Sequence, residues 1–231
     1  MAVPGLHRHP VQGVIRERIE RIDRSVVERF RDVYSAFVAD HFGKHGCMEP
    51  GIKPLDAGSV ICGTAVTSLG PDLTVRRMAI DLMEPGDVLV VAAGGSANRA
   101  CFGDGTALRM SRKDCEGVVI DGMTRDSSGL RTMGFPVFCR GTTQRNHHYP
   151  EDGEHGAVNV SVVCGGVRVE PGDLILGDSD GVLVVDRESA VTEIDKIESN
   201  LADEREMRAA MTSYVPFNVR DELAGRGYKF E

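Results

Sequence analysis

The chain has 231 residues, with 27 Lys and Arg against 35 Asp and Glu, which gives a formal charge of −8 at pH 7. This balance disfavours non-specific binding to nucleic acid or to an anionic membrane surface, because both depend on cationic side chains. No apolar run approaches the roughly 18 to 20 residues of a membrane span, and residues 1–10 lack the apolar centre of a signal peptide. We therefore expect a soluble, cytoplasmic protein that binds neither nucleic acid nor membrane.

The first part of the chain carries apolar residues at helical spacing, which predicts amphipathic helices between residues 14 and 45. Asp23 is a suitable N-cap for the second of them, and Ser35 for a third that stops at Gly43. We expect these helices to pack on a sheet.

From residue 59 onward, short β-rich runs alternate first with helical patterns and then with one another. This order predicts a single α/β domain with mixed sheets. A long charged helix is expected from about 187 to 213, packing on or reaching a neighbouring subunit. The predicted helices are 75–83, 105–113 and 127–133, and the predicted strands are 60–67, 88–92, 118–121, 136–139, 158–163, 167–169, 174–176 and 182–185.

The tetrapeptide Glu-Pro-Gly-Asp occurs twice, at 84–87 and 170–173, each time before an apolar strand. Pro and Gly at the central positions of a turn preset its dihedral angles, so we expect two turns without chemical function. Residues 178–181 likewise predict a hairpin turn. Six cysteines occur without a C-x-x-C pair, mostly inside apolar runs, which favours reduced, buried thiols.

Charged residues follow two of the predicted strands. Asp104 comes shortly after the strand that ends at Ala92, and Arg125 and Asp126 come just after the strand that ends at Asp121. In open α/β sheets, ligands gather at the carboxyl ends of the strands, so a crossover would bring these side chains together. An arginine can bind a carboxylate, and an aspartate can bind a hard divalent cation. Alternatively, the two acids cap helices and Arg125 is a surface ion-pair partner.

Several common catalytic motifs are missing. The glycines at 94–95 and 103–105 do not form a dinucleotide fingerprint, and the chain has neither a phosphate-binding G-x-x-x-x-G-K-[ST] loop nor a G-x-S-x-G serine elbow. The residues His147, His148 and His155, with the acids between them, are expected to form a solvated loop.

Asp104, twenty further residues and then Arg125 and Asp126 reproduce a D-x20-R-D pattern. In this pattern the chain resembles the class II pyruvate aldolases of the RraA-like family, which cleave 4-hydroxy-4-methyl-2-oxoglutarate and 4-carboxy-4-hydroxy-2-oxoadipate during the degradation of aromatic compounds. Further motifs match in the same order, and the resemblance extends from about residue 23 to 208. These motifs are at 63–67, 85–88, 102–104, 121–122, 135–137, 171–173 and 178–182.

The resemblance implies an α/β fold over residues 1–231, a layered α/β/β/α sandwich with mixed sheets of the swivelling-domain type. It also implies a homotrimer or homohexamer with active sites between subunits and Mg²⁺ or Mn²⁺ as cofactor. Asp126 would bind the metal. Asp104 and Glu204 of a neighbouring subunit would contact the metal's water ligands, with Glu206 as the register-shifted alternative to Glu204.

The resemblance further implies that Arg125 binds the pyruvoyl end of the substrate, and that Asp104 and Arg125 hold the water that takes the 4-hydroxyl proton. A divalent ion would stabilise the pyruvate enolate, so no Schiff-base lysine is required. Oxaloacetate would be decarboxylated as a side activity, because loss of CO₂ leaves the same enolate. The substrate carboxylate would be bound by backbone at Gly103, Gly105, Thr106 and Ala107.

The loop 94–99 departs from the characterised aldolases. Arg99 in this loop either binds a distal carboxylate of the substrate or forms a surface ion pair. Two other functions compete with the aldolase. The family also contains non-catalytic regulators of an RNA-degradation enzyme, and similar sequences have been labelled methyltransferases, although no S-adenosylmethionine loop is present here.

Overall fold

The computed structural model describes residues 13–70, 72–93, 98–146 and 156–230. The chain divides into two compact units, one ending at Asp195 and the other beginning at Lys196. The first unit contains the sheet.

Four parallel strands form the centre of the sheet, in the spatial order β3, β4, β5, β6. Parallel neighbours need a crossover connection, and here one helix follows each of the first three strands. All seven elements lie where the sequence predicted them, with ends shifted by a few residues. The strands are β3 (Ile61–Leu69), β4 (Asp87–Ala92), β5 (Gly117–Thr124) and β6 (Val137–Thr142), and the helices are α3 (Leu73–Leu82), α4 (Asp104–Ser111) and α5 (Ser127–Met133).

Antiparallel strands complete the sheet. One hairpin pairs with β3, a further short strand pairs with the other end of β3, and a two-residue strand pairs with β6. The expected mixed α/β fold is therefore confirmed. These strands are β10 (Leu174–Asp178), β11 (Gly181–Val185), β7 (Ala157–Val158) and β2 (Lys53–Pro54), and a separate two-stranded sheet contains β8 (Val162–Cys164) and β9 (Val167–Val169).

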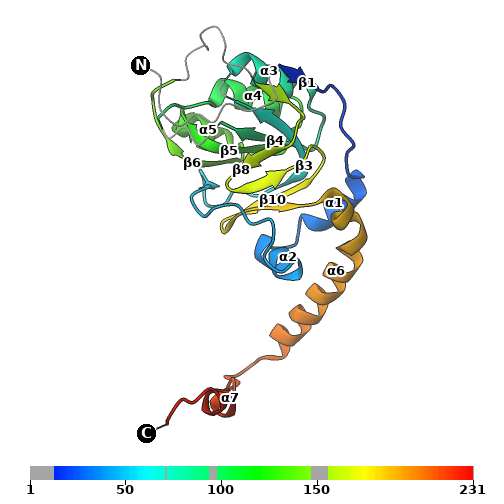
Figure 1. Ribbon diagram of the computed structural model, residues 1–231, viewed down its shortest axis with the longest axis vertical. Helices are drawn as coiled ribbons and strands as arrows, with labels where there is room; N and C mark the ends of the chain where they lie inside the picture. The colour runs from blue at the N-terminus through cyan, green and yellow to red at the C-terminus, as the bar shows by residue number, and fades with distance from the viewer. Residues whose placement is uncertain (1–12, 71, 94–97, 147–155, 231) are drawn as a thin grey trace. The chain divides into compact units, whose positions relative to one another are not determined.

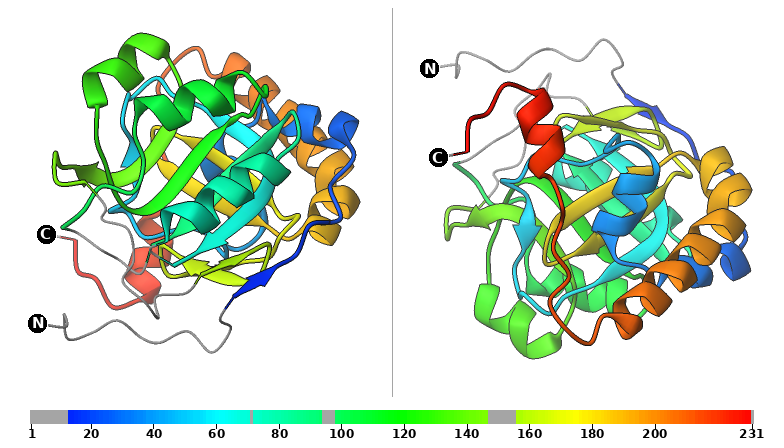
Figure 2. Two further views of the ribbon diagram at one scale, coloured as in Figure 1. Left: turned by 90° about the horizontal axis from the view of Figure 1, so that it is seen from above. Right: turned by 90° about the horizontal axis from the view of Figure 1, so that it is seen from below.

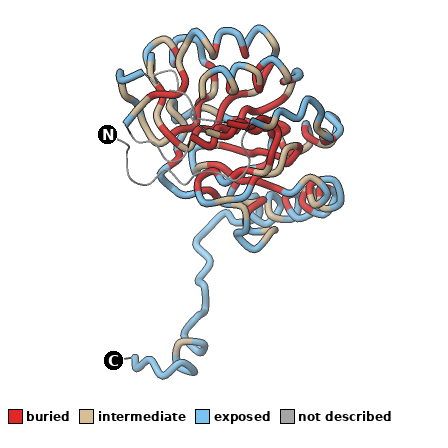
Figure 3. Tube along the Cα trace, turned by 45° about the horizontal axis from the view of Figure 1, so that its top comes forward, coloured by how far each residue is buried: buried red, intermediate tan, exposed pale blue. Residues whose placement is uncertain are grey.

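The two faces of the central strands bury different partners, because successive side chains of a strand point to opposite faces. On β4, Leu89 and Val91 pack with the residues of α3, α4 and α5. Val88 and Val90 pack instead with the apolar residues of β8, β9, β10 and β11. Figure 1 shows the three helices on one face and the hairpins on the other, and in Figure 3 the buried segments concentrate in the strands between them.

Two helices precede the sheet in the chain. Helix α1 (Arg24–Phe30) contacts β3, whereas α2 (Ser35–His41) contacts β10 and β11, and the right-hand view of Figure 2 shows α2 over these two strands. Asp23 caps α1 as predicted, with Oδ1 accepting from the amide of Ser25 at 2.8 Å. Ser35 is not the cap of α2: Tyr34 occupies that position, and Ser35 Oγ donates to Asp178 Oδ1 at 2.8 Å.

The prediction of a helix starting at residue 14 was wrong. Val14 and Ile15 form β1 (Val14–Ile15), which pairs in parallel with β7, and no helix begins before Arg24 in the described chain. The amide of Arg16 continues this pairing by donating to the carbonyl of Val158 at 3.1 Å. Strand pairing of β-branched residues here overrides the helical spacing of the apolar residues.

Both Glu-Pro-Gly-Asp segments form the predicted turns. Gly86 and Gly172 have positive φ angles of 91° and 100°, which glycine adopts without a steric penalty. In each turn the final aspartate accepts from the backbone amide of the first glutamate, at 2.7 Å for Asp87 and 2.8 Å for Asp173. The hairpin turn expected at 178–181 is also present, between β10 and β11.

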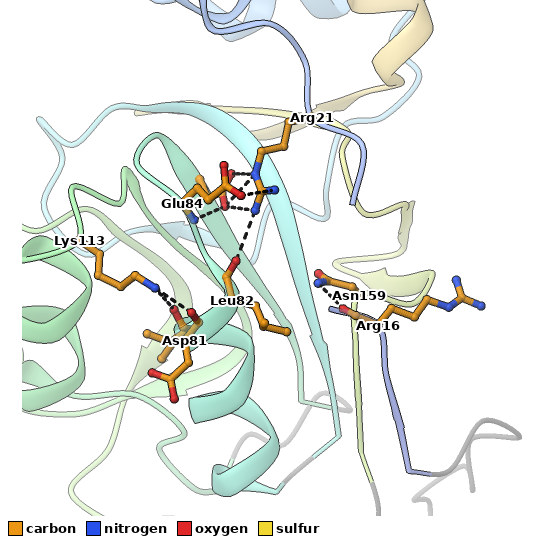
Figure 4. Close-up of polar contacts among 9 residues, drawn as sticks. Arg16, Arg21, Asp81, Leu82, Glu84, Lys113 and Asn159 are labelled. Carbon is orange, nitrogen blue, oxygen red and sulfur yellow. Dashed lines mark hydrogen bonds and ion pairs between the residues drawn. The ribbon is translucent and has the colours of Figure 1, made fainter. Parts of the chain in front are cut away.

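Asp87 is additionally paired with Arg21, which lies before α1. The Nε and Nη2 atoms of Arg21 donate to the two oxygens of Asp87 at 3.1 and 2.8 Å, and Nη1 lies 3.0 Å from Glu84 Oε1. Figure 4 shows this guanidinium beside Glu84 and Leu82. The pair connects the chain before α1 to the start of β4.

The six cysteines are free and five of them are buried, as expected. Burial raises the pKa of the Cys62 thiol to about 12, so this side chain is inert at neutral pH. None of the described helices combines the length and the apolar content that crossing a membrane requires.

The long helix α6 (Arg187–Ala210) begins where the sequence predicted it and ends three residues earlier than expected. It contains the boundary between the two units. The second unit also contains α7 (Arg220–Gly225), with the guanidinium of Arg220 placed 4.1 Å from the centre of the Phe230 ring. Most residues of this unit are exposed.

Candidate active site

The predicted site residues lie at the carboxyl ends of two adjacent parallel strands. Asp104 is the first residue of α4, which follows β4, and Arg125 and Asp126 stand between β5 and α5. The helices α4 and α5 contact each other, so the two loops are neighbours. This is the location at which open α/β sheets bind ligands.

The segment before α4 is held against the end of β5 by backbone hydrogen bonds. The amide of Cys101 donates to the carbonyl of Met123 at 3.0 Å, and the amide of Arg125 donates to the carbonyl of Phe102, also at 3.0 Å. Thr124 Oγ1 donates to the same Phe102 carbonyl at 3.1 Å. These bonds place Gly103 and Asp104 beside Arg125 and Asp126.

Each of the two carboxylates lies against a glycine of the other loop. A Cβ atom at Gly103 would stand 2.5 Å from Asp126 Oδ2, and a Cβ atom at Gly129 would stand 2.8 Å from Asp104 Oδ2. Because both distances are shorter than any ordinary contact, only glycine leaves the carboxylates in these positions. Gly129 belongs to the first turn of α5, so the two acids reach across to each other's helix.

The helix-capping alternative for the two acids fails in the structure. Gly103, and not Asp104, is the N-cap residue of α4, and Asp126 occupies the N-cap position of α5 without a side-chain capping bond. Asp126 has a left-handed backbone, with φ 56° and ψ 35°. Its carboxylate is directed instead to Arg125, whose Nε donates to Asp126 Oδ2 at 3.1 Å.

This ion pair is half-exposed, with 39% of the Arg125 side chain and 33% of the Asp126 side chain accessible. The ion-pair alternative for Arg125 is thus correct, although its partner is the adjacent site residue. A pair this exposed contributes about 0 to 1 kcal/mol to stability, and both groups remain accessible to a ligand.

The helix start offers fewer free amides than expected. The amides of Thr106 and Ala107 donate to the carbonyl of Gly103 at 3.0 and 3.1 Å, so neither is free for a substrate carboxylate. The amide of Gly105 has no acceptor within the described chain. Binding of a substrate carboxylate at Gly103, Gly105, Thr106 and Ala107 stays a prediction, and among the last three only the Gly105 amide lacks a bond to another described residue.

Other charged residues near the strand ends are engaged in the fold. Asp121 on β5 pairs with Arg140 and accepts from the amide of Gly165 at 3.1 Å, so its carboxylate holds the β8–β9 hairpin. Lys113 donates to the carbonyls of Ile80 and Asp81 at 3.1 and 2.9 Å, as Figure 4 shows, and these bonds tie it to the end of α3.

Arg99 is half-buried, and its Nη1 donates to the carbonyl of Asn146 at 3.2 Å. The amide of the next residue, Ala100, donates to the carbonyl of Arg145 at 2.8 Å, so the two segments run side by side. The expected loop residues 94–97 and the cluster at 147–155 lie outside the described residues.

Glu204 belongs to the second unit, and its Oε1 accepts from Arg208 Nε at 2.6 Å, one helical turn away. Glu206, its register-shifted alternative, is exposed. No group of three or more His, Cys, Asp or Glu side chains able to bind a metal occurs among the described residues of this single chain.

Two carboxylates nevertheless fit a hard divalent cation. Asp104 and Asp126 supply oxygen ligands, which Mg²⁺ and Mn²⁺ prefer, and Mg²⁺ is commonly bound through only one or two carboxylates while it keeps several waters. The guanidinium of Arg125 lies next to Asp126, and a guanidinium is a planar donor that can bind a carboxylate.

Sequence reasoning did not identify Gly129, whose missing side chain accommodates Asp104. A signal was present, because a glycine inside a seven-residue helix costs about 1 kcal/mol relative to alanine and therefore needs a reason. It also did not identify Arg76 on α3, which is fully buried.

Comparisons with known proteins identify the family of this chain. The family model described as "RraA-like: Aldolase/RraA" matches residues 35–184. A protein of Halalkalibacterium halodurans named "Putative 4-hydroxy-4-methyl-2-oxoglutarate aldolase" is 32% identical over 192 residues, which cover 82% of this chain and 90% of that protein. A protein of the same name from Aromatoleum aromaticum is 34% identical over 140 residues, 59% of this chain and 85% of that one.

Among solved structures, Streptomyces coelicolor RraAS2, described as an unusual member of the RNase ES inhibitor RraA protein family, superposes with a TM-score of 0.70. It is 31% identical, and the match covers 82% of this chain and 100% of that one. The family match over more than half of the chain and the extent of these similarities establish that the chain belongs to the RraA-like family.

Proposed function

We propose that this protein is a divalent-metal-dependent pyruvate aldolase, which cleaves a 4-hydroxy-2-oxo acid into pyruvate and a second oxo acid. The substrate is of the 4-hydroxy-4-methyl-2-oxoglutarate or 4-carboxy-4-hydroxy-2-oxoadipate type, and oxaloacetate is decarboxylated as a side reaction. The observation that carries the proposal is the reciprocal placement of two carboxylates over two glycines, beside an accessible guanidinium.

Arg125 binds the pyruvoyl end of the substrate, because a planar guanidinium matches the geometry of a carboxylate. Its Nε atom is bonded to Asp126, and 39% of its side chain is accessible to a ligand. The free amide of Gly105 adds a donor at the start of α4. In this proposal Arg99, at the edge of the same region, binds a distal carboxylate.

Asp104 and Asp126 would hold Mg²⁺ or Mn²⁺, with Asp126 as the proposed direct ligand and Asp104 as a residue that would contact the metal's water ligands. When bound, the cation supplies positive charge next to the oxygen that becomes negative as the carbon–carbon bond breaks. The protein's own residues perform the remaining steps.

The reaction balances without a further reagent. Asp104 and Arg125 hold a water that accepts the proton of the substrate's 4-hydroxyl, and C4 then forms a carbonyl as the C3–C4 bond breaks. The electron pair of that bond passes to the pyruvoyl fragment as an enolate. Protonation at C3 of the enolate releases pyruvate. Decarboxylation of oxaloacetate ends in the same protonation.

We further propose that the site is completed between subunits of a homotrimer or homohexamer. Two carboxylates are a small ligand set, and Glu204 of a neighbouring chain would add a third acid that contacts the metal's waters. Glu206 is the alternative. In this oligomer, Glu204 would give up its present bond to Arg208.

The test is to couple pyruvate release to lactate dehydrogenase with oxaloacetate and with 4-hydroxy-4-methyl-2-oxoglutarate. We expect turnover with Mg²⁺ or Mn²⁺, loss of turnover in EDTA, and recovery when the metal is added back. Turnover that persists unchanged in EDTA would contradict the metal-dependent mechanism. A panel of substrates that differ only in the 4-substituent then defines the specificity.

The second candidate function is a regulator that binds an RNA-degradation enzyme through its surface. It is favoured by the similarity to RraAS2, whose description names the RNase ES inhibitor RraA family. A pure binding protein has no physical need for the two glycine-supported carboxylates. Absence of turnover with every 2-oxo acid tested, together with inhibition of a ribonuclease of that class, would favour the regulator.

A further inference from the structure

Arg76 on α3 is fully buried, with 0% of its surface accessible. Arginine is almost never fully buried unless it is paired with an acid. Its Nη1 donates to the carbonyl of Cys101 at 2.8 Å and its Nη2 to that of Gly70 at 3.4 Å, whereas its Nε has no acceptor in the described chain. Within the same residues no carboxylate forms an ion pair with it.

The two carbonyls belong to segments that lead to the candidate active site. Gly70 directly follows β3, and its own amide donates to the carbonyl of Ala92 at the end of β4 at 3.0 Å. Cys101 lies in the connection between β4 and α4, three residues before Asp104. The guanidinium thus joins the carboxyl ends of two parallel strands to the segment that carries a site acid.

The same short segment is held from its other side by β5. Cys101 donates its amide to Met123, and the Phe102 carbonyl accepts from the amide of Arg125. Residues 101–102 therefore lie between Arg76 and the strand that ends in the site. Asp104 follows two residues later, and its position depends on both sets of contacts.

We propose that Arg76 is a positioning residue for this site, which holds the Cys101 carbonyl so that Asp104 keeps its place against Gly129. Burying a guanidinium without a carboxylate is costly, and an apolar side chain of similar length would fill the space without that cost. The charge is therefore better explained by the two carbonyls it holds than by stability. The part of the test that measures enzymatic activity rests on the function proposed above.

The experiment compares Arg76→Met and Arg76→Lys with the wild type in the full chain. Two quantities are measured: kcat and KM for oxaloacetate, and the dissociation constant for Mn²⁺ alone, from the electron paramagnetic resonance signal of the free ion. Loss of a residue that orients metal ligands typically costs about 10- to 100-fold in affinity or activity. We expect changes of about this size in kcat and in Mn²⁺ affinity for Arg76→Met, with KM changed less than about threefold. Arg76→Lys keeps the positive charge but offers one nitrogen in place of the two that hold the carbonyls, so it should recover only part of the loss.

The matched control is Arg21→Met, which removes a partly buried arginine that pairs with Asp87 at the start of β4, away from the strand ends that carry the site. It should lower the melting temperature while kcat and Mn²⁺ affinity per folded molecule stay at the wild-type level. If Arg76→Met loses function only in proportion to its unfolded fraction, as this control does, the proposal is wrong. Wild-type kinetics and Mn²⁺ affinity in Arg76→Lys would also overturn it, even if Arg76→Met does not fold.

The Mn²⁺ measurement separates this proposal from the proposed function. A wild type that binds Mn²⁺ but cleaves no 2-oxo acid would refute the aldolase, and the Arg76 variants would then be judged by affinity alone. A wild type that binds no Mn²⁺ and is inactive would refute both, because no site would remain to be positioned.

Discussion

Two arginine–aspartate pairs of this protein have the same chemistry and opposite situations. Arg21 holds both oxygens of Asp87, whose side chain is 2% exposed and also accepts a backbone amide. Burial raises the pKa of Asp87, and the Arg21 bonds lower it in part. Arg125 and Asp126 share one hydrogen bond, and about a third or more of each side chain is accessible. The hydrogen-bonding groups of Arg21 and Asp87 are occupied by contacts within the fold, whereas those of Arg125 and Asp126 remain accessible to a ligand.

The largest effect is expected at the accessible pair. Arg125→Ala and Asp126→Asn should each lower kcat/KM for oxaloacetate by about 10²- to 10³-fold, as for loss of a group that stabilises developing charge. Their melting temperatures should stay close to that of the wild type, because an exposed pair contributes little stability. Coupled pyruvate assays and calorimetry measure the two quantities. A large loss of stability with near-normal turnover would show that Arg125 and Asp126 serve the stability of the fold and not the activity.

A methyl group next to the accessible pair should have the next largest effect. In Gly129→Ala the new Cβ displaces the Asp104 carboxylate, and a shift of about 1 Å in a site can cost about 100-fold in rate. Alanine also favours the helix by up to about 1 kcal/mol, so stability should hold or rise while activity falls. Gly58→Ala is the control, since no atom lies within 4 Å of its added Cβ. Equal activity in both variants would show that the Gly129 contact does not matter.

The buried pair should respond in stability alone. Arg21→Met leaves Asp87 buried without its cation, and breaking such a pair costs about 2 to 3 kcal/mol where one partner is still 24% exposed. Urea unfolding should show a lower midpoint, and kcat per folded molecule should not change. A fall in kcat at full folding would mean that this pair also supports the site.

The smallest effect concerns Asp173, the counterpart of Asp87 in the second Glu-Pro-Gly-Asp turn. It accepts from the amides of Glu170 and Arg187, and among the described residues no arginine side chain pairs with it. Burial raises its pKa. Because the folded state then binds the proton more tightly, this group contributes stability that is fully present below the ordinary aspartate pKa of about 3.9 and is lost as the pH rises through the raised value.

Asp173→Asn lacks this titration, so its stability relative to wild type should improve as the pH rises above about 4. Urea midpoints measured at several pH values provide the comparison. A difference between the two proteins that does not vary with pH would mean that the folded pKa of Asp173 is not raised.

The central sheet and the strand-end positions of Asp104, Arg125 and Asp126 could be predicted from the sequence, because both depend on local patterns of apolar and turn residues. Apolar runs between turns predict buried strands, and a strand-end location predicts a site. The helical spacing of Ile15, Ile19 and Ile22 predicted a helix that does not form. Strand β1 pairs instead with β7, which is more than 140 residues away in the sequence, and no local pattern indicates such a contact. Gly129 and Arg76 were missed for the same reason: their partners, Asp104 and Cys101, are distant in the chain.

The left-handed backbone of Asp126 restricts which side chains this position can carry. Residues with longer or branched side chains pay about 1 to 2 kcal/mol in that conformation, whereas aspartate, asparagine and glycine adopt it readily. Replacing Asp126 by asparagine or glycine therefore removes the charge at low conformational cost, whereas a longer acidic side chain at this position is disfavoured. The main chain itself therefore favours a short side chain at the position between β5 and α5, before any substrate binds.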